Sequence, residues 1–197
     1  MMKRILVLLL ALTLTVAGLM VAISEEGATP APETEPTSHI LVVYFSATGT
    51  TRGVAEKLAE GLKADLYEIV PEVPYTDADL NYNSSKSRTS IETDDPSCRP
   101  AIAGELPDLT GYDTVLIGYP IWWGDAPRIL STFVESVDLT DKTVAVFFTS
   151  GGSGLGNSMR HLEQQAGAGT WLEGKRFTPH NTVEEVTSWA VSLGIEL

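Results

Sequence analysis

Four short apolar runs constrain the fold of this chain more than any other feature of its sequence. They are ILVVYF at 40–45, LYEIV at 66–70, TVLIGY at 114–119 and TVAVFF at 143–148. Their length and their β-branched and aromatic residues predict strands. All but the run at 66–70 lack polar alternation, which is typical of strands buried on both faces of a parallel sheet. The run at 66–70 alternates partly, as an edge strand does.

Patterns typical of amphipathic helices lie between and after these runs. Val54, Leu58 and Leu62 recur at helical spacing after the first strand. Thr182 and Glu185 match a capping box at the start of the last helix. The apolar positions of the other predicted helical faces are Ile129, Leu130, Phe133 and Val134, then Leu155, Met159 and Leu162, and finally Val186, Trp189, Ala190 and Leu193.

Strands that alternate with helices imply an α/β fold. A parallel sheet wrapped by helices on both faces is expected, because right-handed crossovers leave few other topologies. A weaker signal predicts a fifth strand around 170–173, so the expected class is a doubly wound five-stranded parallel sheet. In such sheets a ligand binds where the strand order reverses, outside the carboxyl ends of the strands.

The N-terminus has the pattern of a targeting segment followed by a tether. Two basic residues precede an apolar run that ends at Ile23, so residues 1–24 are predicted to be a signal peptide. The alternative is an uncleaved membrane anchor, because the run approaches spanning length. Residues 25–38 are rich in proline and glutamate and predict a flexible linker, and the folded domain is expected at 39–197. We therefore expect an exported protein, periplasmic or extracellular, attached to a membrane only through an uncleaved N-terminus.

The charge balance is strongly acidic. The chain has 13 basic and 26 acidic residues, a net charge of −13, which argues against nucleic acid as a partner. Removal of residues 1–24 takes away Lys3 and Arg4 and no acidic residue, which lowers the net charge from −13 to −15. Such a surface favours either a basic partner or simply solubility.

The segment SATGTT at 46–51 joins the first strand to the first helix. The unpaired N–H groups and the dipole of a helix N-terminus attract anions, and Gly49 lets the backbone approach one closely. The side chains that add hydroxyl donors without positive charge are those of Ser46, Thr48, Thr50 and Thr51. One hydroxyl would suffice for a helix cap, which is the alternative interpretation. The cluster therefore predicts a phosphate site built from neutral donors.

The segment YPIWWGDAPR at 119–128 follows the third strand. Neighbouring side chains of an extended chain point to opposite faces, so Trp122 and Trp123 cannot both enter the core. At least one indole is expected to be exposed as a stacking platform for a flat ring, and the alternative is a tryptophan packed under a neighbouring loop. Asp125 either adds charge beside that ring or caps a helix that begins at Ala126.

A third loop, FFTSGGSGLGNS at 147–158, follows the fourth strand and is rich in glycine. Glycine loops are common, so the position of this one matters more than its composition. All three loops emerge at the same edge of the predicted sheet, where a ligand with a phosphate and a planar ring would touch each of them. His39, His161 and His180 lie outside these loops and are predicted to be surface or cap residues.

Residues 71–112 contain turn formers and scattered charge without a convincing periodicity. Loops of this length are typically functional lids or irregular subdomains. The side chains expected to anchor the segment are Tyr75, Tyr82, Ile91 and Ile102.

These motifs make the chain resemble the flavodoxin family over about 39–195. SATGTT is similar to the phosphate loop of that family, and YPIWWG and TSGGSG resemble the ring-contacting loops of a bacterial flavodoxin-like branch. The resemblance implies the strand order 2-1-3-4-5 and flavin mononucleotide (FMN) as the cofactor. It implies phosphate contacts from Ser46, Thr48, Gly49, Thr50 and Thr51. It implies ring contacts from Pro120, Ile121, Trp122, Trp123, Gly124, Ser150, Gly151 and Gly152.

An FMN site without a recognisable catalytic acid or base predicts an electron-transfer flavoprotein, whose partner is a redox protein or a small-molecule electron acceptor. The first alternative is an enzyme that reduces quinones with a nicotinamide donor and the same flavin, with 71–112 as a lid. The second is an exported protein that keeps the scaffold without a cofactor, because a chain exported unfolded must acquire flavin outside the cytoplasm. No catalytic side chain and no metal site is predicted.

Overall fold

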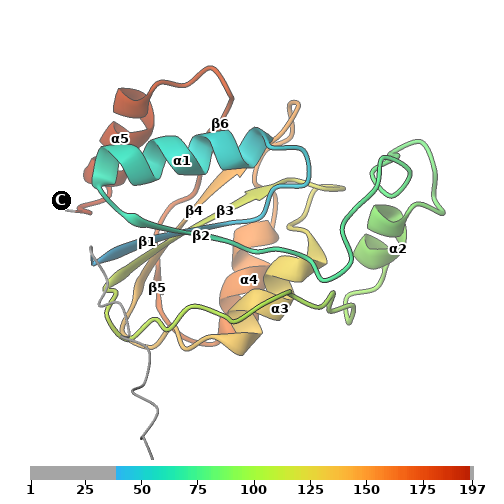
Figure 1. The fold of residues 1–197 in the computed structure, drawn as a ribbon, viewed down its shortest axis with the longest axis horizontal. Helices are drawn as coiled ribbons and strands as arrows, with labels where there is room; N and C mark the ends of the chain where they lie inside the picture. Colours follow the sequence, from blue (N-terminus) through green and yellow to red (C-terminus); the bar gives the residue numbers. More distant parts are fainter. Residues whose placement is uncertain (1–38, 196–197) are drawn as a thin grey trace, which may run out of the picture. The chain divides into compact units, whose positions relative to one another are not determined.

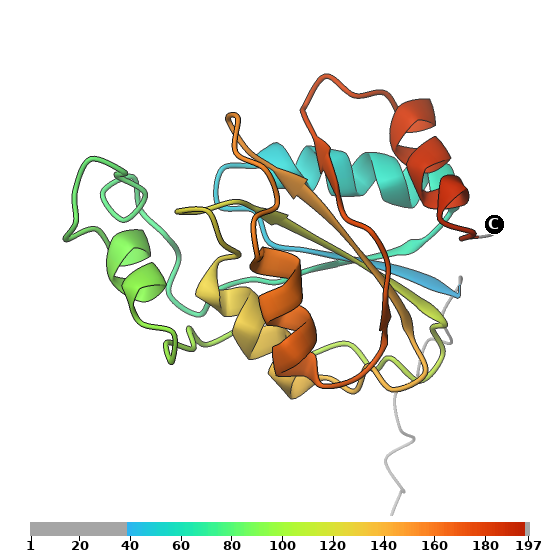
Figure 2. The same cartoon turned by 180° about the vertical axis from the view of Figure 1, so that it is seen from behind.

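A parallel sheet lies between two layers of helices in the computed structural model, which describes residues 39–195 (Figure 1; Figure 2). Its order is β2-β1-β3-β4-β5, with parallel pairing throughout. The strands are β1 Ile40–Tyr44, β2 Asp65–Glu68, β3 Thr114–Pro120, β4 Thr143–Thr149, β5 Thr170–Trp171 and β6 Lys175–Phe177. This order confirms the predicted doubly wound α/β class, and it confirms β2 as an edge strand.

The fifth position of the sheet is divided between two short strands. Both β5 and β6 pair with β4, β5 opposite Thr143 and Val144 and β6 opposite its last three residues. Between them, a Cβ added at Gly174 would lie 2.4 Å from a methyl group of Val146, so the chain passes too close to β4 for a larger residue. The described sheet therefore has six strands where five were predicted.

Two pairs of helices cover the sheet, one pair on each face. Helices α1 (Thr50–Leu62) and α5 (Val183–Ser192) lie on one side, and α3 (Arg128–Ser136) and α4 (Ser158–Ala166) lie on the other (Figure 1). The capping box predicted for α5 is present, because the N–H of Glu185 donates to Thr182 Oγ1 at 3.2 Å and the N–H of Thr182 donates to Glu185 Oε2 at 2.9 Å. This cap fixes the start of α5 at the predicted residue.

The core follows from the two-residue period of β1. Ile40, Val42 and Tyr44 pack with α1 and α5, whereas the alternate residues pack with α3 and α4 on the opposite face. The runs of β3 and β4 are buried in the same way. Each fully buried aliphatic side chain contributes roughly 1.5–3 kcal/mol, so the central strands hold the two helix layers together.

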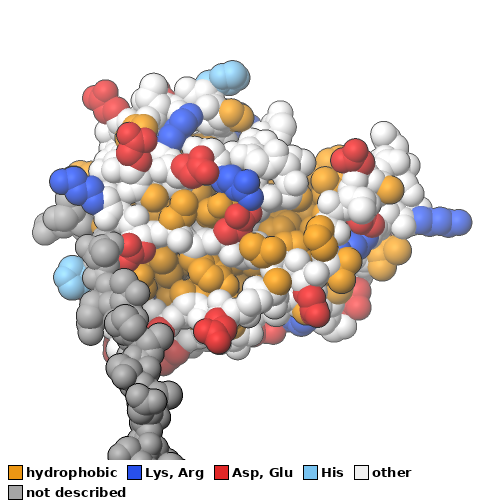
Figure 3. Space-filling model, viewed as in Figure 1, with side chains coloured by type: hydrophobic (Ala, Val, Ile, Leu, Met, Phe, Trp, Pro, Cys, Tyr) orange, Lys and Arg blue, Asp and Glu red, His pale blue; other side chains and the backbone are white. Residues whose placement is uncertain are grey.

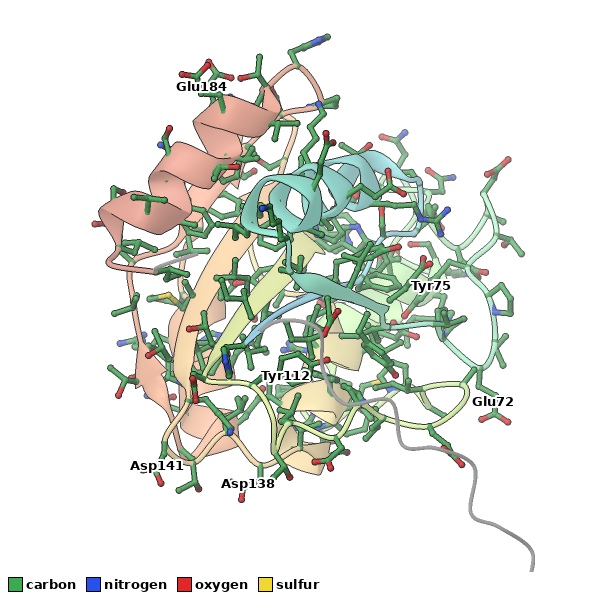
Figure 4. All side chains as sticks on the ribbon, turned by 60° about the vertical axis from the view of Figure 1, so that its left-hand side comes forward. Glu72, Tyr75, Tyr112, Asp138, Asp141 and Glu184 are labelled. Carbon is green, nitrogen blue, oxygen red and sulfur yellow. The ribbon has the colours of Figure 1, made fainter. Side chains whose placement is uncertain are left out.

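The insertion at 71–112 is irregular except for the short helix α2 (Arg88–Asp94), which the sequence pattern did not predict. Tyr75, labelled in Figure 4, anchors it. Its ring lies 5.2 Å from that of Trp122, and its hydroxyl donates to Glu92 Oε2 at 2.7 Å. Burial and the Glu92 carboxylate raise the pKa of Tyr75, so its hydroxyl stays protonated. Ile102 also packs on the core, but Tyr82 and Ile91 are 53% and 57% exposed and do not anchor the segment as predicted.

No helix within residues 39–195 is long and apolar enough to cross a bilayer. The predicted signal peptide or anchor at 1–24 and the linker at 25–38 lie outside the described residues, so both remain predictions.

Candidate functional site

A cavity of about 330 Å³ opens at the carboxyl ends of the strands. Its volume lies within the range of roughly 300–1,000 Å³ that is usual for small-molecule sites. Its walls are Ser46, Ala47, Thr48, Thr50, Thr51, Leu80, Tyr82, Pro120, Ile121, Trp122, Thr149, Ser150, Gly151, Phe177, Thr178 and Pro179. The cavity thus lies at the sheet edge where the strand order reverses between β1 and β3.

One wall is the loop that leads into α1. Gly49 precedes the helix with φ 84°, and the first turn of α1 receives no side-chain cap among the described residues. A Cβ at Gly49 would meet nothing within 4 Å, so the left-handed backbone, not lack of space, requires glycine there. The hydroxyls of Thr48 and Thr50 lie 3.4 Å apart at this helix end. Uncapped N–H groups beside neutral hydroxyls are a donor set that suits a phosphate.

Thr51 differs from its neighbours because its hydroxyl already has a partner. Thr51 Oγ1 lies 2.8 Å from Thr149 Oγ1, and both side chains are buried. This contact ties the start of α1 to the end of β4. Because the hydroxyl is paired, the backbone N–H is the group of Thr51 that is available to donate to a ligand. The predicted contact of Thr51 with a phosphate stays a prediction.

A tight turn at 122–125 forms a second wall. The N–H of Trp122 donates to the carbonyl of Asp125 at 2.9 Å, and the reverse hydrogen bond has the same length. The two central residues, Trp123 and Gly124, have φ of 52° and 78°, as in a type I′ turn. A left-handed conformation costs a residue other than glycine roughly 1–2 kcal/mol, so the turn is strained at Trp123.

The adjacent indoles of this turn point to different environments. Trp122 is 4% exposed and packs edge-on against Phe45 at 5.4 Å, whereas Trp123 is 48% exposed. The prediction that at least one indole is exposed is confirmed. Trp122 supplies the apolar wall of the cavity, and the Trp123 ring lies outside the cavity lining, 5.7 Å from the ring of Tyr82.

The carboxylate of Asp125 connects the tight turn to α3 and α4. Its Oδ1 accepts from the N–H of Ala126 at 2.8 Å, and its Oδ2 lies 3.4 Å from Nη1 of Arg128 and 3.1 Å from Nδ1 of His161. Helix α3 begins at Arg128, so Asp125 is not the helix cap that the sequence suggested. His161, predicted to be a surface or cap residue, lies on α4 with its side chain 41% exposed, and its ring contacts the Asp125 carboxylate of the second loop.

The third loop packs closely on the second. A Cβ at Gly156 would lie 2.8 Å from the carbonyl oxygen of Gly124, so a larger residue would push the two loops apart. Ser150 and Gly151 line the cavity, and the hydroxyl of Ser150 donates to the carbonyl of Ser153 within the loop. The three loops predicted to converge therefore meet at one edge of the sheet.

The predicted site residues divide into two groups. Those that line the cavity are Ser46, Thr48, Thr50, Thr51, Pro120, Ile121, Trp122, Ser150 and Gly151. Those that lie outside the lining are Gly49, Trp123, Gly124 and Gly152. Gly49 and Gly124 still shape the two loops through their positive φ angles. Contacts of all these residues with a cofactor remain predictions.

Two cavity walls were missed from the sequence. Phe177 ends β6 and is followed by Thr178 and Pro179, and Lys57 of α1 holds this segment by donating to the carbonyl of Pro179 at 2.8 Å. The rule that ligands bind at carboxyl strand ends would have included this loop had the weak fifth strand been extended to Phe177. Leu80 comes from the irregular insertion, along with Tyr82, and no pattern in that segment indicated either.

The lining of this cavity contains no charged side chain, although the chain has a net charge of −13. A bound anion would therefore face neutral donors and the N-terminus of α1, without a carboxylate in the cavity lining to repel it. Within residues 39–195, no group of three or more His, Cys, Asp and Glu residues is arranged to hold a metal ion.

The flavodoxin family model matches residues 39–193. A proposed flavoprotein from Bacteroides eggerthii is 46% identical, with 80% of this chain and 98% of that chain covered and a TM-score of 0.75. A second, from Bacteroides uniformis, is 43% identical over 77% of this chain and 97% of that chain, with a TM-score of 0.73. A flavoprotein from Lactobacillus acidophilus, solved in complex with FMN, is 27% identical over 77% of this chain and 97% of that chain, with a TM-score of 0.58. No curated protein matches the sequence significantly.

Proposed function

Because the chain belongs to the flavodoxin family, we propose that it binds FMN in the cavity at the carboxyl ends of the strands and carries electrons between partners. Bound FMN would supply the redox chemistry, since a flavin accepts and releases electrons singly or in pairs. The protein would supply the position of the flavin and the electrostatic environment around it.

One observation carries this proposal. The uncapped N-terminus of α1, with Thr48 and Thr50, and the indole of Trp122 form walls of the same neutral cavity. This donor set fits a phosphate at one side and an apolar ring at the other. The FMN complex of the Lactobacillus acidophilus relative supports the choice of this flavin.

The chemistry of the lining favours a carrier over an enzyme with its own catalytic groups. No Asp, Glu, His, Lys or Cys side chain lines the described cavity, so proton transfer there has no strong acid or base from the protein. Acidic side chains are spread over the face of the molecule seen in Figure 3, which suits a basic redox partner. We place this exchange outside the cytoplasm, on the basis of the predicted export signal.

Titration with two flavins tests the site. The fluorescence of FMN should be quenched as FMN binds the purified domain. Riboflavin, which lacks the phosphate, should bind at least about tenfold more weakly, because charge-assisted hydrogen bonds contribute roughly 1.5–3 kcal/mol. Equal affinity for the two flavins would contradict a phosphate site at α1. Failure of both to bind would favour the interpretation of a scaffold without a cofactor.

Potentiometry of the FMN complex tests the carrier function. Two well-separated one-electron steps are expected of a protein that passes single electrons between partners. A single two-electron step would contradict this function and would favour an enzyme that transfers electron pairs.

A second candidate function is a nicotinamide-dependent reductase that uses the same flavin. It is favoured by Leu80 and Tyr82, because the insertion contributes these residues to the cavity wall as a substrate lid would. Steady-state oxidation of a reduced nicotinamide with a quinone as acceptor would support it. Absence of turnover with a fully FMN-loaded protein would eliminate it.

A further inference from the structure

A second cavity, of about 390 Å³, lies beside the tight turn at 122–125, between α3, α4 and the segment that follows α2. Its walls are Pro96, Asp125, Arg128, His161, Gln164 and Gln165. Whereas the cavity at the strand ends is neutral, this one is lined by an aspartate, an arginine and a histidine. We call the side chains of Asp125, Arg128 and His161 the charged hub.

The carboxylate of Asp125 joins the other two members of the charged hub. Its Oδ2 lies 3.4 Å from Nη1 of Arg128 and 3.1 Å from Nδ1 of His161. The side chains of Asp125 and Arg128 are 16% and 11% exposed, whereas that of His161 is 41% exposed. Because a carboxylate only accepts hydrogen bonds, Nδ1 of the imidazole carries its proton. Nε2 is then the nitrogen that can bind a second proton from solvent.

The net charge of the hub depends on that second proton. The hub is neutral with a neutral imidazole, and it gains one positive charge when Nε2 is protonated. Tyr119 of β3 faces Asp125, and burial raises the pKa of its phenol. Asp95 and Cys98 of the insertion face Arg128; hydrogen bonds lower the pKa of the Asp95 carboxyl, and burial raises the pKa of the Cys98 thiol. Among these groups, only the imidazole is of a type that titrates between pH 5 and 8.

Gln165 provides an independent reason to expect a proton in this cavity. Its Oε1 is buried and has no hydrogen-bond partner among the described residues. A buried acceptor without a partner costs free energy, and a cationic donor in the same cavity recovers part of that cost. A second proton on His161 would therefore enter a cavity that already offers an unpaired acceptor.

The tight turn connects the hub to the proposed flavin site. Trp122 and Asp125 exchange two backbone hydrogen bonds of 2.9 Å, and Trp122 lines the neutral cavity. No charged side chain in that lining masks the charge of the hub, and the partly buried position of the hub weakens screening by salt. Any electron that enters the flavin without a matching proton at the ring leaves a negative charge there. A positive hub would attract this charge.

We propose that His161 is a positioning residue that couples proton uptake at its Nε2 to reduction of the flavin. The inference rests on the proposed FMN site. The electron comes from the redox partner and the proton from water, and both leave when the flavin is reoxidised. His161 acts through Asp125 and the tight turn, because it does not line the flavin cavity. By linkage, the proton and the electron strengthen the binding of each other by the same factor.

The coupling is measured first by NMR titration of the His161 ring, in the oxidised FMN complex and in the complex fully reduced with dithionite without oxygen. The midpoint of the titration should lie about 0.5 pH unit higher in the reduced complex, which corresponds to about threefold tighter proton binding. His39 is the internal control, because it lies 3.7 Å from Asp113 at the amino end of the sheet and both side chains are 84% exposed. Equal midpoints for His161 in the two complexes, or an equal shift of His39, overturn the inference.

The reduction equilibrium is measured next, against a reference dye. His161→Gln keeps a hydrogen-bond donor for Asp125 but cannot take up a proton. At about pH 5.5 the equilibrium constant for reduction should be about threefold lower in this variant than in wild type, and at about pH 8.5 the two should agree. His39→Gln should match wild type at both values. If His161→Gln changes FMN affinity or stability without changing the pH profile of reduction, the role of His161 is structural and the inference is overturned.

Binding of oxidised FMN separates this inference from the proposed function. At about pH 8.5 the FMN dissociation constant of His161→Gln should stay within about twofold of wild type. If FMN does not bind the wild-type protein, the proposed function fails and this inference fails with it. If FMN binds and is reduced but the His161 midpoints agree, the inference alone is overturned.

Discussion

The two ends of the sheet use similar polar residues in opposite ways. At the amino ends of β3 and β4, Asp-Leu-Thr occurs twice, and each aspartate caps its own loop. The N–H of Thr110 donates to Asp108 Oδ1 at 2.9 Å, and the N–H of Thr140 donates to Asp138 Oδ1 at 2.9 Å. At the carboxyl ends, the hydroxyl-rich loop at 46–51 leaves the first turn of α1 without a side-chain cap.

The difference separates structural polar groups from groups available to a ligand. A polar side chain that bonds its own loop is satisfied without any partner, and it stabilises the turn. Uncapped N–H groups at a helix start forgo a stabilisation of about 1 kcal/mol that a serine or threonine at the cap position would supply. We therefore expect changes at the carboxyl end to alter flavin binding, and changes at the amino end to alter stability alone.

The largest effect is expected from Thr50→Asp. A carboxylate at the first residue of α1 would repel a phosphate held there and would remove a hydroxyl donor, for a combined loss of about 2 kcal/mol. The FMN dissociation constant should rise about 30-fold, measured by fluorescence titration. Thr140→Asp adds the same charge at the amino end and should leave the constant unchanged. Equal effects of the two variants would show that net charge, not position, controls binding.

Much of this contrast was predictable from the sequence. The buried runs of β1, β3 and β4 have no competing interpretation, and the order of strands and helices then places the loops at 46–51, 119–128 and 147–158 at one edge. Strand periodicity also predicted that the two indoles would separate. The candidate site was therefore predictable where it depends on parallel strands ending together.

The remainder depends on tertiary contacts that no local pattern encodes. His161 lies 36 residues from Asp125 in the sequence, and only the packing of α4 beside α3 brings them to 3.1 Å. The pairing of Thr51 with Thr149 spans 98 residues. Tyr82 reaches the cavity through an insertion whose course is set by Tyr75 and the network around Glu92, and its irregular backbone gave no periodicity to follow.

Thr51→Val separates a structural hydroxyl from ligand-facing groups within the carboxyl-end loop itself. The substitution keeps the shape of the side chain but leaves the buried Thr149 hydroxyl without its partner, which should lower the free energy of unfolding by about 1–2 kcal/mol. FMN affinity should stay within about threefold of wild type, because this hydroxyl is already committed. The double variant Thr51→Val with Thr149→Val should recover part of the stability. A loss of FMN affinity comparable to that of Thr50→Asp would instead place the Thr51 hydroxyl on the ligand.

Lys57→Met is expected to have a smaller effect on binding. The ammonium group donates to the carbonyls of Pro179 and Asn181 at 2.8 and 2.7 Å, so it positions a cavity wall without lining the cavity. FMN affinity should fall about threefold as this loop loosens, which corresponds to a cost below about 1 kcal/mol. Lys142→Met removes the same charge at the amino end and should change the affinity less. If the two variants weaken FMN binding equally, Lys57 acts through long-range charge, not through the loop.

Asp138→Asn should have the smallest effect, and its pH dependence identifies the role of the capping aspartates. Hydrogen bonds from the backbone and side chain of Thr140 lower the pKa of Asp138 below its ordinary value. A lowered pKa in the folded state means that the charged cap stabilises the fold above the unfolded value of about 3.9, and that this stabilisation is lost as the pH falls through the folded value. Thermal unfolding should therefore show a slightly lower midpoint for the variant at pH 7, and the difference should vanish in acid. The FMN affinity of the variant should equal that of the wild type at pH 7, and also in acid wherever the complex still forms. A difference that grows toward low pH, or a weaker FMN complex, would mean that the amino end of the sheet is not purely structural.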